Sequence, residues 1–198
     1  MEISIVKLEK ILNYKIKKHC ISLGWDTAEI CGVSVIKTDD KNVYLDWFVL
    51  EFDKKDINHV YNALSKESLK LLSQKCDICI IEDTYLKFFW NPRTRKQQPQ
   101  VEVMKKLTRF GGIILANAIN NNVEYQIIGA TSARSKFKIK TTGYGRGNAK
   151  QGVIDWIKNK LQIDLQEDNA CDAIVLGCLG ICEDIDFSSK KKKKRKKT

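Results

Sequence analysis

The chain has 198 residues, of which 43% are hydrophobic and 9% aromatic, and this is enough for one domain with its own core. A wholly disordered protein is therefore excluded, and we expect no membrane segment because no apolar run is long enough to span a bilayer. The formal charge is +11, and residues 190–197 alone contribute eight basic side chains. Such a run does not pack, so we expect 188–198 to be a disordered polybasic tail, serving as a nucleic-acid tether, an address signal or a solubility device.

The seven cysteines lie mostly inside apolar runs, and no signal peptide precedes them. This pattern is typical of reduced thiols in a cytoplasmic protein. Cys76 and Cys79 have a spacing that zinc sites use, but they begin a strand-like run and lack a second pair at zinc-knuckle spacing. We therefore expect structural thiols here rather than a zinc site.

The first half of the chain alternates apolar and polar residues in two different periods. Residues 1–18 have helical spacing with lysines between the apolar positions, which predicts a basic amphipathic helix or arm. Helical spacing returns at 56–75, where Asp56 is a plausible N-cap. Strands are predicted at 19–26, 31–39 and 42–52, as a hairpin meander, and at 76–82, as a central strand buried on both faces.

The second half begins with a segment, 83–100, that mixes aromatic and basic residues with both prolines. This composition predicts a long loop without regular structure, and long loops in compact domains are usually functional. The remaining predicted elements are a helix at 101–122, a strand at 123–131, a Gly-rich basic loop at 136–148, a helix at 149–161 and a final helix at 166–180. The order indicates an α/β fold with a mixed five-stranded sheet flanked by helices.

Three acidic residues stand at the ends of these elements. Asp26 and Glu82 each end an apolar strand, and carboxyl ends of strands border the site crevice in α/β sheets, so we expect their side chains to converge. The alternative is a turn aspartate and a surface glutamate. In the last helix Asp168 could be a cap, but Asp172 lies one turn inside, on the same face, where two carboxylates repel unless a cation joins them. Capping plus a solvated aspartate remains the alternative there.

Four segments, in this order and spacing, resemble the RuvC family of Holliday junction resolvases, with phage-encoded members closest: SLGWDTAEICGVSVI, IIEDTYL, GYGRGNAK and DNACDAIVLG. The resemblance spans residues 19–182. It implies an RNase H-like nuclease domain at 19–187 that cuts four-way DNA junctions as a homodimer with Mg²⁺. RNase H enzymes proper carry their glutamate on a helix, whereas Glu82 follows a strand, which favours the resolvase branch.

The resemblance also implies roles for individual residues. Asp26, Glu82 and Asp172 would be metal-binding catalytic carboxylates. A fourth acidic or histidine ligand usually lies three residues before the last aspartate, where this chain has Asn169. We favour Asp168 instead, because its charge helps to hold a divalent cation, whereas an amide offers only a neutral oxygen. Lys150 matches a catalytic basic residue near the scissile phosphate, although a lone lysine is also typical of a solvated surface.

The cofactor implied is a pair of Mg²⁺ ions, for which Mn²⁺ is an alternative. Two such cations about 4 Å apart activate water and stabilise the leaving 3′-oxygen of a phosphodiester. Tyr85 matches an aromatic residue that stacks on junction bases, with simple packing as the alternative. Basic residues expected to offset the repulsion between the carboxylates and DNA are Arg93, Arg95, Lys96, Lys136, Lys138, Arg146 and Lys150.

The sequence therefore predicts a crossover junction endodeoxyribonuclease, a phosphodiester hydrolase that makes paired symmetric nicks in branched DNA, in the cytoplasm of a bacterium or a phage-infected cell. One alternative is an RNase H-like nuclease with another substrate, such as other branched DNA or RNA–DNA hybrids. A non-catalytic DNA-binding protein that uses the basic arm, loop and tail is the other. The acidic residues distinguish a nuclease from a non-catalytic DNA-binding protein, because the latter gains nothing from carboxylates that face phosphates.

Overall fold

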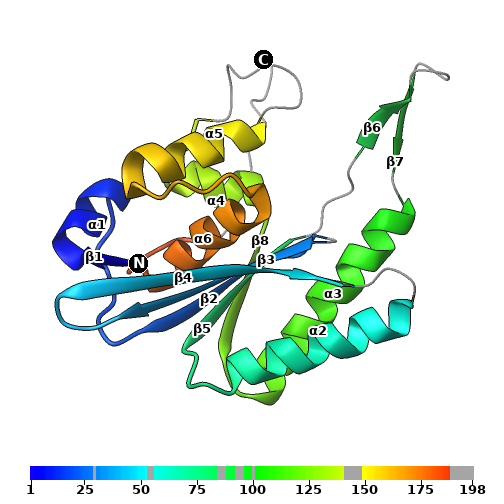
Figure 1. Cartoon of the computed structure of the whole chain (residues 1–198), viewed down its shortest axis with the longest axis horizontal. Helices are drawn as coiled ribbons and strands as arrows, with labels where there is room; N and C mark the ends of the chain where they lie inside the picture. The colour runs from blue at the N-terminus through cyan, green and yellow to red at the C-terminus, as the bar shows by residue number, and fades with distance from the viewer. Residues whose placement is uncertain are drawn as a thin grey trace, which may run out of the picture.

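The computed structural model describes residues 1–28, 30–52, 56–83, 88–91, 96–99, 101–140 and 149–187, and for 88–91, 96–99, 101–104 and 149 it describes the backbone alone. The predicted tail, 188–198, lies outside the described residues. A six-stranded mixed sheet has helices on both faces (Figure 1). The predicted α/β class with a mixed, helix-flanked sheet is therefore confirmed.

The main sheet has the strand order β1-β4-β3-β2-β5-β8. Strands β2, β3 and β4 form the antiparallel meander that the sequence predicts, and β5 and β8 continue the sheet in parallel pairing. All five predicted strands are present, and a short sixth, β1, adds to the edge beside β4. The strands are β1 (Glu2–Ser4), β2 (Ile21–Asp26), β3 (Ile30–Thr38), β4 (Asn42–Glu51), β5 (Ile78–Glu82) and β8 (Glu124–Ile128).

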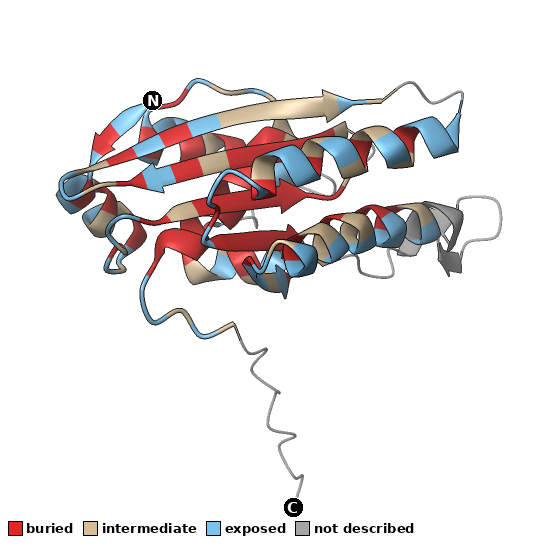
Figure 2. Cartoon of the chain, turned by 90° about the horizontal axis from the view of Figure 1, so that it is seen from below, coloured by how far each residue is buried: buried red, intermediate tan, exposed pale blue. Residues whose placement is uncertain are grey.

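The helices cover the two faces of this sheet unequally (Figure 1). One face carries α1, α4, α5 and α6, and the other carries α2 and α3, whose outer sides are exposed in Figure 2. No helix in the described ranges combines the length and apolar character needed to cross a bilayer. The helices are α1 (Ile5–Leu12), α2 (Ile57–Leu72), α3 (Val101–Asn120), α4 (Ala130–Lys136), α5 (Ala149–Trp156) with its π-helical extension Ile157–Leu161, and α6 (Asp168–Ile181).

The prediction that 83–100 lacks regular structure is wrong. A two-stranded antiparallel hairpin forms there from β6 (Phe88–Asn91) and β7 (Lys96–Pro99). The Phe-Phe-Trp run in β6 has high strand propensity. The two prolines do not prevent pairing, because Pro92 falls between the strands and Pro99 at the end of one, positions where proline is tolerated.

A second departure concerns α4, which occupies residues predicted as the end of a strand and the start of a loop. Strand β8 ends at Ile128, and Gly129, in an extended conformation, is the N-cap of the helix. The short helix docks Ala133 into the core, since this side chain is 1% exposed. We did not predict it because seven residues give too few turns for a clear helical period.

Residues near the N-terminus are part of the core. Ser4 caps α1, and the buried Ile5, Leu8 and Leu12 belong to the same apolar cluster as α6. The helical prediction for this segment is confirmed over Ile5–Leu12. The domain boundary between residues 18 and 19 stays a prediction, but apolar side chains from both sides of it pack in one cluster.

Helix α6 lies at the centre of the fold, and every residue from Ala170 to Ile181 is buried. A helix that is apolar on all sides is a core element, which explains why no polar face appears in its sequence. Glycines permit its close approach to the sheet: a Cβ on Gly24 would lie 2.2 Å from the Ala173 carbonyl oxygen. The Ser34 hydroxyl donates to the same carbonyl at 2.7 Å, which fixes α6 along the sheet.

Candidate active site

Strand pairing brings Asp26 and Glu82 side by side. Strands β2 and β5 run parallel, with Trp25 opposite Ile81, so the next residue on each strand is an acidic one at its carboxyl end. The Thr27 hydroxyl donates to the Glu82 carbonyl oxygen at 3.2 Å and ties the two strand ends together.

Strand alternation decides which face these carboxylates occupy. Successive side chains of a strand point to opposite faces, and Trp25 and Ile81 belong to the apolar cluster under α2 and α3. Asp26 and Glu82 therefore face the other side of the sheet, where α6 lies. Their convergence follows from the sequence positions alone once the two strands are known to pair in parallel.

The first turn of α6 starts next to this strand edge. A Cβ on Gly32, the partner of Asp26 in the sheet, would lie 2.0 Å from the Asn169 carbonyl oxygen. The N-cap is Glu167, whose side chain accepts a hydrogen bond from the Ala170 amide at 2.5 Å. The interpretation of Asp168 as a cap is therefore wrong, because the preceding glutamate reaches the free amide, and the Asp168 carboxylate bonds elsewhere.

Asp26 is the most deeply enclosed carboxylate of the group, with 5% of its surface exposed. Burial raises its pKa well above the usual range, and the hydrogen bond that it shares with the Glu82 side chain raises it further. The charges of Glu82 and Asp172 act in the same direction, whereas that of Lys150 opposes them. Asp26, Glu82 and Asp172 are thus close enough for their charges to interact.

Asp172 is held by a residue that the sequence analysis did not identify, Arg134 of α4. The Arg134 Nε donates to Asp172 Oδ1 at 2.9 Å, and its second nitrogen donates to Oδ2. Burial raises the pKa of Asp172, and the guanidinium opposes this shift. A buried carboxylate needs a counter-ion, so a basic partner could have been expected, but the sequence does not say which of 35 basic residues provides it.

Lys150, at the start of α5, lies beside Asp168. Its ammonium forms an ion pair with Asp168, and 58% of the lysine side chain is exposed. Burial alone would lower the pKa of Lys150, but the bond to Asp168 and the charges of Asp26 and Asp172 raise it. The lysine thus stays protonated beside the carboxylates.

The other predicted DNA-binding residues are only partly described. The Lys136 ammonium donates to the backbone carbonyl of Asp186, and Lys138 is exposed just after α4. Lys96 belongs to β7, for which the backbone alone is described. Tyr85, Arg93, Arg95 and Arg146 lie outside the described residues.

Comparisons with known proteins give a fold but no sequence family. No protein-family model matches the sequence, and no curated protein matches it. Among solved structures, RuvC of Thermus thermophilus in complex with a Holliday junction substrate superposes with a TM-score of 0.58 at 15% identity, covering 79% of this chain and 90% of that one. The chain has the RuvC fold. A second structure of Thermus thermophilus RuvC gives a TM-score of 0.57 at 16% identity, covering 82% of this chain and 98% of that one.

The RuvC fold confirms the RNase H-like architecture that the resemblance implies. Identities of 15% and 16% do not distinguish between branches of such a family. The nearness to phage-encoded members therefore stays a prediction.

The oxygen donors at this edge of the RuvC fold fit a hard divalent cation, because Mg²⁺ prefers carboxylate ligands. Within the described ranges, no three His, Cys, Asp or Glu side chains are arranged to hold one ion. Asp168 and Asp172 bond to Lys150 and Arg134 in this arrangement. An ion shared by these aspartates with Asp26 and Glu82 would compete with the basic side chains for the same carboxylate groups.

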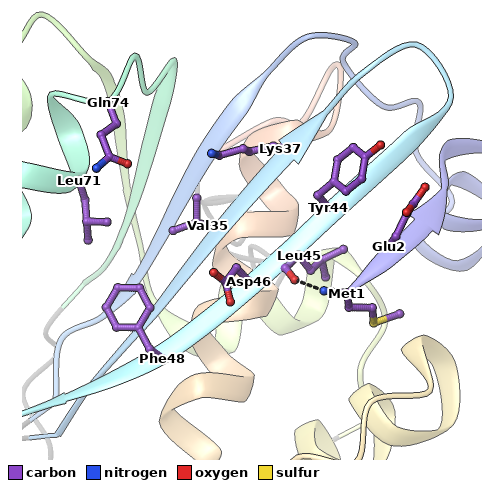
Figure 3. A pocket seen from close by; sticks show the side chains of 10 residues that line it. All are labelled: Met1, Glu2, Val35, Lys37, Tyr44, Leu45, Asp46, Phe48, Leu71 and Gln74. Carbon is purple, nitrogen blue, oxygen red and sulfur yellow. Dashed lines mark hydrogen bonds between the residues drawn. The ribbon is translucent and has the colours of Figure 1, made fainter.

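A cavity of about 570 Å³ lies elsewhere, between the sheet and the end of α2 (Figure 3). Lys37 and Tyr44 line it, and Lys37 pairs with Ile21 at the start of β2, the opposite end from Asp26. Val35 and Phe48 contribute its apolar wall, Leu71 approaches from α2, and Gln74 approaches from the turn that follows this helix. The cavity is therefore separate from the carboxylates.

Proposed function

We propose that the protein is a Mg²⁺-dependent endonuclease that resolves four-way DNA junctions by paired, symmetric nicks. The observation that carries this proposal is the convergence of Asp26, Glu82 and Asp172 at one edge of a sheet that has the RuvC fold. Carboxylates placed together in this way repel one another, and a bound cation would relieve that repulsion, so their placement favours a metal centre over a structural role.

Each acidic side chain has a role in this proposal. Asp26, Glu82 and Asp172 would hold the cations, with Asp168 as the fourth ligand. When bound, a pair of Mg²⁺ ions supplies an activated water and stabilisation of the leaving oxygen. The protonated Lys150, partly exposed beside Asp168, would bind the scissile phosphate and offset its charge.

A homodimer suits the proposed substrate. Two copies related by a two-fold axis present two equivalent sites, which match the near-symmetry of a four-way junction. One of the superposed RuvC structures was solved with a Holliday junction substrate, which supports branched DNA as the partner. The polybasic residues 190–197 would add contacts to phosphates that do not depend on DNA shape.

The proposal is tested by cleavage of a synthetic four-way junction and of a linear duplex with the same sequence as two of its arms, each with Mg²⁺ or with EDTA. We expect nicks at symmetric positions in two strands of the junction, only with Mg²⁺, at concentrations that leave the linear duplex intact. Equal rates on both DNAs would favour a general nuclease instead. Tight binding without cleavage would favour a DNA-binding protein.

A further inference from the structure

Arg134 pairs with both oxygens of the Asp172 carboxylate. Both carboxylate oxygens accept from the guanidinium, and the two side chains are 9% and 11% exposed for Asp172 and Arg134 respectively. A fork of two parallel bonds is the strongest and most specific pairing that a carboxylate makes with a basic side chain. Each Asp172 oxygen that a cation would use is therefore already bonded to the guanidinium in this arrangement.

The guanidinium also lies within electrostatic reach of the other site carboxylates, since the charges of Glu82 and Asp26 both act on it. A side chain at this place supplies positive charge where the proposed function requires cations. Helix α4 packs against α6, so Arg134 is delivered by one helix to an aspartate on the next. Charge and position together make it an internal substitute for a bound ion.

We propose that Arg134 competes with divalent cations for Asp172, so that metal binding requires the guanidinium to release at least one Asp172 oxygen. This inference rests on the proposed metal centre and adds a control over it. While no cation is bound, the Arg134 guanidinium offsets the negative charge of the acidic cluster. Because it does so by bonding to Asp172, it also lowers the affinity of the site for a cation. Its release also frees a guanidinium at the site edge, where a DNA phosphate is the natural partner.

The test is a calorimetric titration of Mn²⁺ into the full chain without DNA, comparing wild type with Arg134→Gln. Competition predicts that the variant binds Mn²⁺ about tenfold more tightly, which is a typical coupling between two ligands of one group. It also predicts a lower Tm in EDTA and a larger rise of Tm on adding Mn²⁺. Lys70→Gln is the matched control, because it removes the same charge from an ion pair with Glu67 on α2, on the opposite face of the sheet, and we expect unchanged affinity.

Unchanged or weaker Mn²⁺ binding by Arg134→Gln would overturn the competition and make Arg134 a residue that orients Asp172 for the metal. If that variant does not fold, Arg134→Lys is measured in its place, since an ammonium keeps the charge but lacks the fork, and its affinity should still rise. Absence of Mn²⁺ binding by wild type and variants alike would overturn the proposed metal centre together with this inference. Binding by wild type that Arg134→Gln leaves unaltered would overturn the inference alone.

Discussion

Asp26→Asn is expected to reduce Mg²⁺-dependent junction cleavage by about a thousandfold or more, with junction binding nearly unchanged. The substitution keeps the shape of the side chain and removes one negative charge from the most buried ligand position. The measurement is the single-turnover rate on a four-way junction, with binding measured separately in Ca²⁺. Asp46→Asn is the matched control, since Asp46 is an exposed strand aspartate on β4, and its cleavage rate should equal that of wild type.

The same variant should be more stable than wild type when no metal is added. The pKa of Asp26 is higher in the folded state than in the unfolded state, where it is about 3.9. The stability that protonated Asp26 contributes is therefore fully present below the unfolded pKa and is lost as the pH rises through the folded pKa. Asparagine does not titrate and can donate to Glu82. We expect the Tm of Asp26→Asn in EDTA to exceed that of wild type near neutral pH, and the difference to shrink toward pH 4. A variant that loses cleavage and stability together would point to a structural role for Asp26.

Gly32→Ala should destabilise the fold by about 3 kcal/mol and also impair cleavage. An added Cβ would meet the Asn169 carbonyl oxygen at 2.0 Å and the Ala170 amide nitrogen at 2.9 Å. Both atoms are backbone, so relief requires the first turn of α6 to move, and this turn carries Asp168. The measurement is the free energy of unfolding in urea.

The matched control for Gly32→Ala is Gly112→Ala in α3, where an added Cβ meets nothing within 4 Å. Alanine is the better helix former, so this variant should be more stable than wild type by about 1 kcal/mol. If Gly32→Ala unfolds at the same urea concentration as wild type, α6 is not held against β3 as closely as the structure has it.

The sequence was informative about the carboxylates because strand ends and strand periodicity are local properties. Asp26 and Glu82 each follow a clear apolar run, and parallel pairing of those runs brings the two side chains together on one face. Asp172 stood out because an acidic residue inside an otherwise apolar helix is costly without a partner. These positions could be predicted with no knowledge of their three-dimensional contacts.

Arg134 could not be predicted in the same way, because its role depends on the docking of α4 against α6, and α4 was itself too short to recognise. The β6–β7 hairpin was not predicted, because we gave the two prolines more importance than the strand propensity of the Phe-Phe-Trp run in β6. Glu167 rather than Asp168 is the N-cap of α6. Either side chain can accept a hydrogen bond from an amide of the first turn, and only the backbone path decides which one does. In each case, the deciding interaction joins residues whose local sequence permits several outcomes.

The central claim, that Asp26, Glu82 and Asp172 form a divalent metal centre, is tested most directly by anomalous diffraction from crystals grown with Mn²⁺. We expect an anomalous peak coordinated by the Asp26 and Glu82 carboxylates, with an Asp172 oxygen released from Arg134 among its ligands. Mn²⁺ bound only at other places, with the Arg134–Asp172 pair intact, would contradict the claim.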